Sequence, residues 1–361
     1  MGLIGGSIGL AARGRSGAQV CGYDPDQRVR ASALQLGAID EQAGDIATAV
    51  AGADVVFVAA PVGALAATVA LALDAAGPDT VISDVGSTKR ILADAGADER
   101  FVGGHPLAGA ETAGVEHARE DLFDGATWYL TPVKDSTAGV LYERLHSLLR
   151  SFGARPTAID ADTHDRLMAR VSHLPHVLAN LLVAQAAGLL GEQQSGRLPV
   201  PLRVPAVGPS FRDATRVAGA NSAIWTDIYT ANSDALIDSI DELSTRLGDV
   251  RSWLADGNAT AITAWNESAR SEREALHGAG LLGGAAGESI VELRASVPNR
   301  PGVIAEIALA LGHAGVNIAD LALAPSEDNR QGVVGLWISG QENLERASRL
   351  IGELGFPVVQ A

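Results

Sequence analysis

Short apolar runs alternate with longer, alanine-rich stretches through the first part of the chain. Apolar and β-branched residues cluster at 19–23, 53–60 and 80–85, and the stretches between them have the spacing of helices. This alternation predicts βαβ units, and hence a parallel sheet with helices on its faces. A further strand is predicted at 127–132 and a helix at 136–152.

Beyond this α/β part the pattern becomes helical, interrupted only by an irregular segment with four prolines between Gln193 and Pro209. A Gly/Ala/Leu segment without periodicity follows at 278–287. The remaining runs read strand, helix, strand, strand, helix, strand, which is the split βαβ, ferredoxin-like plan. We therefore expect a linker at 278–287 and three domains, at 1–157, 158–277 and 288–361.

A glycine-rich turn opens the first predicted helix, and an acid ends the strand after it. Gly2, Gly5 and Gly6 fall where the backbone of a dinucleotide-binding fold approaches a pyrophosphate. Asp24 lies about twenty residues further on, where an acid accepts hydrogen bonds from ribose hydroxyls and repels a 2′-phosphate. The alternative is a packing turn in an alanine-rich protein. Turn, helix, strand and acid together favour an NAD site, with contacts from Gly2, Leu3, Ile4, Gly5, Gly6, Asp24 and Pro61.

The first strand of such a fold, and the first glycine of G-x-G-x-x-G, would both precede Met1. That strand is central in the usual order and is packed under helices on both faces. We therefore expect the natural chain to begin roughly ten residues upstream and to supply both features. The alternative is that the shortened chain is real and its sheet tolerates the gap.

One imidazole stands in a polar, glycine-flanked segment after a predicted strand. His105 lies within 103–111, which we expect to be a loop beyond the carboxyl end of that strand, where α/β proteins bind ligands. Ser87 and Lys89 follow the strand at 80–85 and are expected at the same edge. A lone loop histidine is usually a turn residue, so the case for chemistry rests on these partners.

The helical region carries further polar candidates. His173 and His176 lie one helical turn apart, with Pro175 expected to kink the helix between them. No third ligand stands at a recognisable spacing, so this pair does not predict a metal site. For His173 we favour a structural role, bonded to neighbouring helices. Arg212 and Arg216 share a helix face, and a guanidinium is a natural clamp for a carboxylate.

Composition narrows the possible functions. The 361 residues carry a formal net charge of −16, which argues against a nucleic acid or an anionic membrane surface as partner. The sequence has no uninterrupted apolar run of about eighteen residues, so we expect no membrane-crossing segment. A single cysteine, Cys21, excludes an internal disulfide framework and fits a reducing cytoplasm.

Five motifs in this order resemble the prephenate/arogenate dehydrogenase family, and the third domain resembles an ACT domain, a small-molecule regulatory module. The resemblance implies a Rossmann-like parallel sheet without its first strand, an all-α central dimerisation domain and a ferredoxin-like ACT domain. It covers nearly the whole chain. The motifs are Gly2–Ser7, Asp84–Lys89, Gly104–Gly109, Ser172–His176 and Phe211–Arg216.

The family oxidises a cyclohexadienol to a phenol, passing a hydride to NAD(P)+ while the ring carboxylate leaves as CO2. The resemblance implies that His105 is the base on the ring hydroxyl, and that Ser87 hydrogen-bonds to that hydroxyl or to His105. Arg216 would bind a substrate carboxylate, and His176 would lie near the other end of the substrate. Glu111 matches a position that pairs with the arginine of the site.

The resemblance therefore implies a homodimeric, NAD-dependent enzyme of tyrosine biosynthesis that acts on prephenate. Arogenate, which has an ammonium in place of the keto oxygen, is the alternative substrate. A catalytically silent amino-acid sensor is an alternative of another class, and the retained His105, Ser87 and Arg216 argue against it. His164 and Asp165 match the family and are expected behind the site. The ACT-like domain is expected to bind an amino acid, tyrosine foremost, near Asn299, Arg300, Gly302, Asn317 and Ile318.

Overall fold

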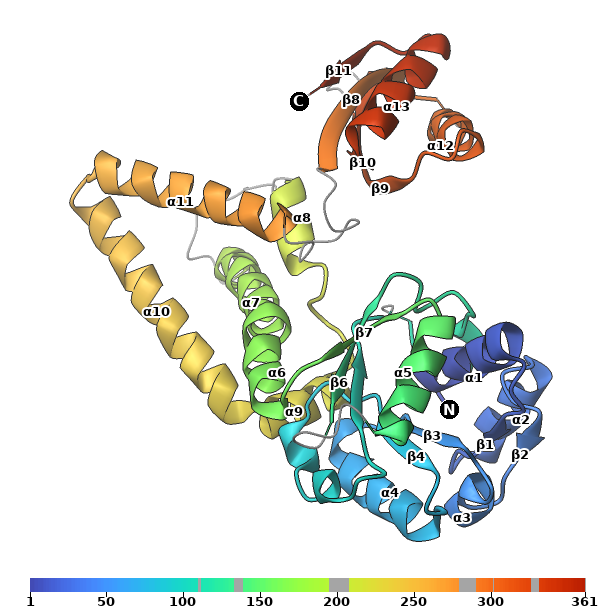
Figure 1. Ribbon diagram of the computed structural model, residues 1–361. Coiled ribbons are helices and arrows are strands. Elements are labelled where there is room, and N and C mark those ends of the chain that lie inside the picture. Colours follow the sequence, from blue (N-terminus) through green and yellow to red (C-terminus); the bar gives the residue numbers. More distant parts are fainter. Residues whose placement is uncertain are drawn as a thin grey trace. The chain divides into compact units, whose positions relative to one another are not determined.

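The protein is described here by a computed structural model (Figure 1). It describes residues 1–109, 112–132, 139–194, 208–278, 290–300, 302–325 and 331–360. The chain divides into two compact units, Met1–Thr245 and Arg246–Ala361. The first unit begins with an α/β part and continues into helices, and the second ends in a smaller α/β domain.

Parallel strands alternate with helices at the start of the first unit, as the apolar pattern predicts. Strand β1 pairs with β2 and β3 with β4, both in parallel, so the segments that follow β3 and β4 lie at one sheet edge. The strands are shorter than the apolar runs that predicted them. The elements are α1 (Leu3–Ser16), β1 (Cys21–Gly22), α2 (Gln27–Gln35), β2 (Glu41–Gln42), α3 (Ile46–Val50), β3 (Val55–Val58), α4 (Val62–Ala75) and β4 (Val81–Asp84).

Helices cover both faces of the β3–β4 pair (Figure 1). Val81 packs into a core shared with α1 and α5 (Val140–Ser151), whereas the next residue, Ile82, packs against α4. Successive side chains of a strand point to opposite faces, so an uninterrupted apolar run is what a strand buried on both faces requires.

The segment that carries His105 is a strand and not the predicted loop. Strand β5 (Gly103–Pro106) pairs antiparallel with β6 (Thr127–Thr131), which pairs in parallel with β7 (Arg155–Ala158). The two glycines of β5 explain the difference. A Cβ at Gly104 would lie 2.5 Å from the carbonyl oxygen of Asp84 and 2.6 Å from Ser83 Oγ. Glycine therefore allows β5 to pack closely against β4, although glycine-rich sequences ordinarily signal turns.

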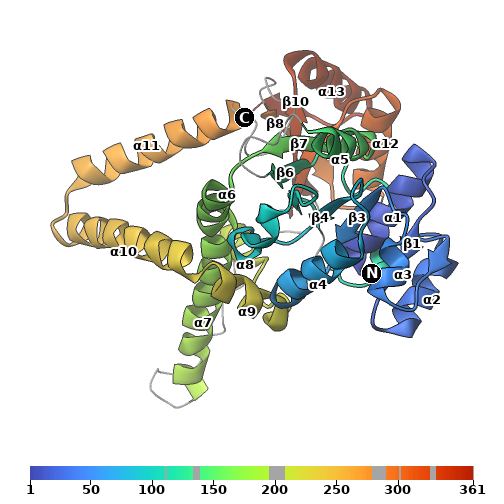
Figure 2. The ribbon, with the colours of Figure 1, turned by 60° about the horizontal axis from the view of Figure 1, so that its bottom comes forward.

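The first unit continues as helices. A kink was predicted at Pro175. The irregularity in the structure is a short π-helical turn, Ala169–His173, that lies directly before α7 and joins α6 to α7 end to end (Figure 2). Proline is tolerated in the first turn of a helix, where its missing N–H leaves no bond unmade. Three short 3-10 turns lie at Arg90–Leu92, Ala95–Ala97 and Val115–His117. The helices are α6 (Ala161–Met168), α7 (Leu174–Gln194), α8 (Pro209–Thr215), α9 (Ser222–Ala231) and α10 (Ser233–Ala255).

Among the described residues, one helical run, Ala161–Gly188, has the length and apolar composition of a membrane-crossing segment. Polar residues interrupt this run, which is why the sequence predicted no membrane-crossing segment. His164, Asp165 and His173 in its first half are buried and hydrogen-bonded to other parts of the first unit. These bonds assign that half of the run to the interior of the protein.

The second unit begins within the C-terminal part of α10, continues with helix α11 (Ala259–Gly278) and ends in a four-stranded antiparallel sheet with the order β11-β8-β10-β9. Apolar residues of α12 and α13 form one core with one face of this sheet. The predicted strand and helix order is confirmed. The predicted linker lies outside the described residues, except for Gly278. The elements are β8 (Ile290–Pro298), α12 (Val303–His313), β9 (Ile318–Pro325), β10 (Gln331–Ser339), α13 (Gln341–Glu353) and β11 (Val358–Gln360).

Candidate active site

A cavity of about 270 Å³ lies where the segments after β4 and around β5 meet the helices of the first unit. It brings together Ser87 and His105, which the sequence predicted to be neighbours. Its remaining wall is mainly apolar, so water is largely displaced from the reacting groups once a ligand fills it. The lining residues are Ser87, His105, Pro106, Leu107, Ala108, Met168, Val171, Ser172, His173, Trp225 and Ile228.

A chain of hydrogen bonds runs from His105 away from the cavity. His105 Nδ1 lies 2.9 Å from His164 Nε2, and His164 Nδ1 lies 2.8 Å from Asp165 Oδ1. A carboxylate only accepts, so His164 carries its proton on Nδ1 and accepts at Nε2. His105 must then donate from Nδ1, which leaves the lone pair on its Nε2. The arrangement thus assigns to His105 the tautomer that a general base requires.

The carboxylate of Asp165 is held in place by two backbone N–H groups. Its Oδ1 accepts from the N–H of Lys89 at 2.8 Å, and its Oδ2 accepts from the N–H of Arg90 at 2.9 Å. Burial alone would raise the pKa of Asp165, but hydrogen bonds from His164 and from these two N–H groups outweigh burial, and the pKa is lowered. Asp165 is therefore a fixed anion beneath His164.

Burial lowers the pKa of His105 well below its ordinary value, and the neighbouring His164, Lys89 and His173 lower it further. The imidazole is therefore neutral at neutral pH. Its lone pair is available to accept a proton. The positive charge that His105 then gains is stabilised by the carboxylate of Asp165, which lies behind His164.

Lys89 was expected at this edge with Ser87, but it is not among the residues that line the cavity. Its ammonium is buried against the carboxylate of Asp84 and donates to the carbonyl oxygen of Gly104 at 2.6 Å. Asp84 Oδ1 in turn accepts from the N–H of Gly104 at 3.0 Å. This pair hydrogen-bonds to both backbone polar groups of Gly104, the residue before His105, and so positions the strand that carries the base.

His176, predicted to contact substrate, is buried beside the cavity rather than in its wall. Its ring stacks on Trp225 with 3.6 Å between centroids and 4° between planes, and its Nδ1 contacts the hydroxyl of Tyr229. Arg216, at the end of α8, is likewise not among the cavity-lining residues. Glu111 lies outside the described residues. The roles expected of these three residues stay predictions.

Four of the residues predicted for the cofactor, Gly2, Gly5, Asp24 and Pro61, lie at the edge where α1 begins, whereas Leu3 and Ile4 pack against the apolar core and Gly6 is buried against Val115 and Ala118. Asp24 Oδ2 lies 2.6 Å from the amine of Met1, and a Cβ at Gly5 would lie 3.2 Å from the Cβ of Ala59, just after β3. Gly2 is the N-cap of α1 and makes no side-chain cap, and a Cβ there would meet nothing within 4 Å. Pro61 is the N-cap of α4 at the same edge.

This edge fits a dinucleotide. Uncapped N–H groups at the start of a 14-residue helix attract a pyrophosphate, and the open space at Gly2 lets it approach. Asp24 is part-buried beside the same turn and offers a carboxylate to ribose hydroxyls.

Two polar residues of the site were not singled out from the sequence. Asn232, between α9 and α10, donates from Nδ2 to the carbonyl oxygen of Asp165 at 2.7 Å. Arg90 hydrogen-bonds to Asn232 Oδ1 at 2.7 Å and to Asp234 Oδ2 at 2.7 Å. Only the packing of distant helices brings these side chains to Asp165, and nothing in their local sequence signals it.

Comparison with known proteins shows to which family the chain belongs. Family models for the nucleotide-binding and dimerization domains of prephenate dehydrogenase match residues 8–157 and 160–266. A prephenate dehydrogenase of Bacillus subtilis is 31% identical over 97% of this chain and 94% of its own length. The chain belongs to the prephenate dehydrogenase family. A match of that length also includes the C-terminal α/β domain.

Other family members and structures resemble the chain less completely. A cyclohexadienyl dehydrogenase of Zymomonas mobilis is 32% identical over 76% of this chain and 94% of its own. The crystal structure of Aquifex aeolicus prephenate dehydrogenase with hydroxyphenyl propionate and NAD+ has a TM-score of 0.67 at 25% identity, covering 75% of this chain and 94% of that one. Synechocystis arogenate dehydrogenase has a TM-score of 0.64 at 26% identity, with coverages of 75% and 96%.

Proposed function

We propose that this family member is an NAD-dependent prephenate dehydrogenase of tyrosine biosynthesis, which converts prephenate to 4-hydroxyphenylpyruvate and CO2. The observation that carries the proposal is the His105–His164–Asp165 chain at the wall of a cavity that Ser87 also lines. It supplies a neutral base of defined tautomer, which the oxidation of a ring hydroxyl needs.

Each residue of the site has its own role in the proposed reaction. His105 Nε2 accepts the proton of the ring hydroxyl, with Ser87 as a hydrogen-bonding neighbour of that oxygen. Gly2–Gly6 and Asp24 would hold NAD+, which would serve as the hydride acceptor. As the hydride leaves, the electron pair of the bond to the ring carboxylate enters the ring, CO2 departs and the phenol oxygen recovers a proton. The family resemblance assigns Arg216 to a substrate carboxylate and His176 to the other end of the substrate, with Glu111 paired with the arginine of the site.

Parallel assays with prephenate and arogenate test this function. We expect NADH formation with prephenate, measured by absorbance, together with CO2 release. Faster turnover of arogenate would make the protein an arogenate dehydrogenase. The similarity to the Synechocystis enzyme is the reason to test this alternative. Inactivity with both substrates, despite binding of NAD+, would favour the amino-acid sensor and contradict the proposal.

Asp24 is expected to give a preference for NAD+ over NADP+ in kcat/KM. In Asp24→Ala the ribose hydroxyls lose a charged acceptor, a hydrogen bond of about 1.5–3 kcal/mol, so KM for NAD+ should rise roughly 10- to 100-fold. Steady-state kinetics with both cofactors measure this. Asp26→Ala is the matched control, because Asp26 lies two residues away and pairs with the exposed Arg28. A wild-type preference for NADP+ would contradict the assignment of Asp24.

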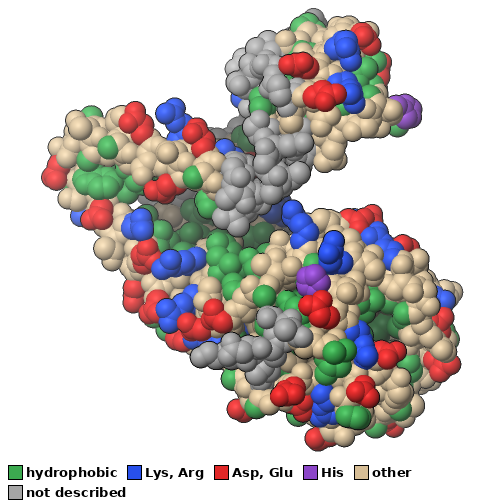
Figure 3. Space-filling model, in the orientation of Figure 1, with side chains coloured by type: hydrophobic (Ala, Val, Ile, Leu, Met, Phe, Trp, Pro, Cys, Tyr) green, Lys and Arg blue, Asp and Glu red, His purple; other side chains and the backbone are tan. Residues whose placement is uncertain are grey.

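We also propose a cytoplasmic homodimer. Helix α7 exposes Leu181, Leu182 and Val183, and apolar side chains gather over this helix in Figure 3. Exposed apolar surface of this kind is typical of a subunit interface, and the helical region matches the dimerization model of the family. The single cysteine, which is exposed and unpaired, suits a reducing compartment.

The C-terminal domain is proposed to be an ACT-like module that binds tyrosine and lowers activity. Gly302 caps α12 with a left-handed φ of +89°, beside the exposed Arg300, and Asn317 is exposed directly before β9 and Ile318. Asn299 belongs to the same turn after β8. Exposed polar groups beside a glycine turn suit the ammonium and carboxylate of an amino acid.

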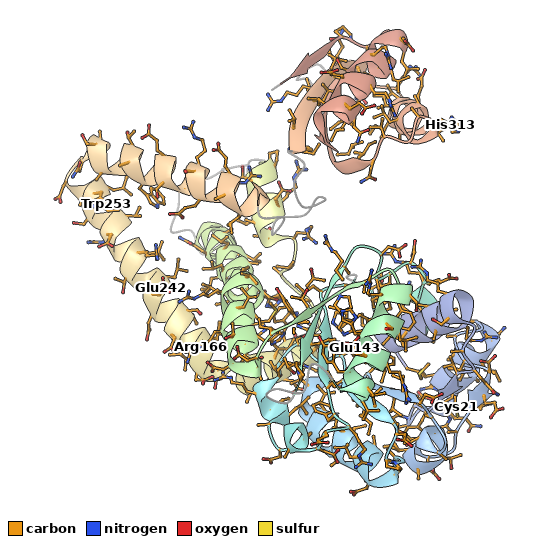
Figure 4. The ribbon with its side chains drawn as sticks, in the orientation of Figure 1. Cys21, Glu143, Arg166, Glu242, Trp253 and His313 are labelled. Atoms are coloured by element: carbon orange, nitrogen blue, oxygen red, sulfur yellow. The ribbon has the colours of Figure 1, made fainter. Side chains whose placement is uncertain are left out.

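Asn317→Ala is therefore expected to raise the tyrosine concentration for half-inhibition about tenfold, as loss of one hydrogen bond of about 1.4 kcal/mol would do. Initial rates at varied tyrosine measure this, and kcat without tyrosine should stay at the wild-type value. His313→Ala is the control, because His313 is exposed at the end of α12 (Figure 4) and is not among the proposed ligand residues. Wild-type rates that do not respond to tyrosine would contradict the regulatory role.

A further inference from the structure

His173 is a second imidazole at the cavity, and the reaction scheme above does not use it. It is 1% exposed and lines the cavity together with His105 and Ser87. Its Nδ1 lies 3.2 Å from Nδ2 of Asn232. The two ring nitrogens of an imidazole lie on different edges of the ring, so the edge with Nε2 is left for the cavity.

The neighbours of Asn232 decide which end of its amide faces His173. Its Oδ1 accepts from Arg90 Nη2 at 2.7 Å, and its Nδ2 donates to the carbonyl oxygen of Asp165 at 2.7 Å. Both contacts require the amide in this orientation, so an N–H points at His173 Nδ1. Nδ1 therefore accepts, and neutral His173 carries its proton on Nε2. His105 offers a lone pair to the cavity, whereas His173 offers a donor.

The surroundings also keep His173 uncharged. A second proton on Nδ1 would face the N–H of Asn232. Burial lowers the pKa of His173 to about 4; nearby Asp165 opposes this shift, whereas His164 and His176 add to it. His173 is therefore a neutral donor, and in the described part of the chain neither lysine nor arginine lines the same cavity.

We propose that Nε2–H of His173 binds the ring carboxylate of the substrate, the group that leaves as CO2. This inference rests on the function proposed above. The ring hydroxyl is assigned to His105 and Ser87. His173 is a donor in another part of the wall of the same cavity, so it suits the ring carboxylate, which is the other polar group on the ring. The charge of this carboxylate disappears as CO2 forms. A neutral donor orients it without the strong ground-state stabilisation that a cation would give.

Comparison of substrate and product tests the contact, because 4-hydroxyphenylpyruvate has no ring carboxylate. In His173→Leu we expect KM for prephenate to rise about 10- to 100-fold, as loss of a hydrogen bond to a charged group does. The inhibition constant of 4-hydroxyphenylpyruvate should change less than twofold. His173→Gln, which restores an N–H donor, should recover part of the prephenate affinity. Equal weakening of both ligands, or an unchanged KM, would overturn the proposal.

The protonation of His173 can be read in the full-length wild-type protein without any substrate. We expect long-range ¹H–¹⁵N spectra of histidine-labelled protein to show His173 neutral, with its proton on Nε2, from pH 5.5 to 8. The His173→Gln spectrum identifies its signals among the eight histidines. A proton on Nδ1, or a charged ring at pH 7, would overturn the proposal. Wild-type protein inactive with prephenate would overturn the proposed function instead, while the spectra would still report the donor.

Discussion

His105→Asn is expected to lower kcat about 10²–10⁴-fold while KM for prephenate changes little. A positioned general base contributes about this much to the rate of a proton transfer. Asparagine preserves a polar side chain in the narrow β5 strand but has no lone pair of comparable basicity at the position of Nε2. Steady-state kinetics with saturating NAD+ measure the two parameters separately.

The pH dependence provides a second readout of the same substitution. Only neutral His105 can accept a proton, and burial holds its pKa well below 6.5. The activity it supplies is therefore complete at neutral pH and is lost only as the pH falls through that lowered pKa. We expect kcat/KM of the wild type to stay flat from pH 8 down to about 6.5, and the residual rate of His105→Asn to lack the acid limb.

His117→Asn is the matched control for His105→Asn, because His117 is exposed in the 3-10 turn Val115–His117. It should keep wild-type kcat. If His105→Asn instead raises KM and leaves kcat intact, His105 binds substrate and is not the base.

Elements with local signals could be predicted from the sequence. Runs such as 53–60 and 80–85 identify strands buried on both faces, and the order of elements after residue 290 identifies the second α/β fold. Ser87 and His105 could be expected to meet, because segments at the carboxyl ends of neighbouring strands converge at one edge of a sheet. That His105 is itself part of strand β5 could not be expected. Strand β7 was missed, since Arg155–Ala158 shows no alternation of apolar and polar residues.

Contacts that depend on helix packing could not be predicted. His164 reaches His105 across 59 positions, and Arg90 reaches Asn232 across 142. The family resemblance placed His164 and Asp165 behind the site, but only the tertiary structure shows that they orient a base. The sequence favoured a structural role for His173, and His173 does hydrogen-bond to Asn232 in a neighbouring segment. The sequence did not indicate that the other edge of the His173 ring faces the cavity.

Asp165→Asn is expected to lower kcat about 10²–10⁴-fold although Asp165 does not touch the cavity. Both oxygens of Asp165 accept hydrogen bonds, Oδ1 from His164 and Lys89, and Oδ2 from Arg90. If the amide nitrogen takes the Oδ1 position, His164 must accept at Nδ1 and carry its proton on Nε2. His105 then accepts at Nδ1 and carries its own proton on Nε2, so its lone pair is lost from the cavity.

Either orientation turns the amide nitrogen toward a backbone N–H, that of Lys89 at the Oδ1 position or that of Arg90 at the Oδ2 position. A buried donor is then left unpaired, which costs about 1–3 kcal/mol of stability. The free energy of unfolding must therefore be measured beside kcat, and the histidine spectra show whether the proton of His105 has moved from Nδ1 to Nε2. Asp162→Asn is the matched control, because Asp162 lies on the same helix, half-exposed and paired with Arg166. A folded Asp165→Asn protein with kcat within threefold of wild type would show that His105 needs no carboxylate behind His164 to act as the base.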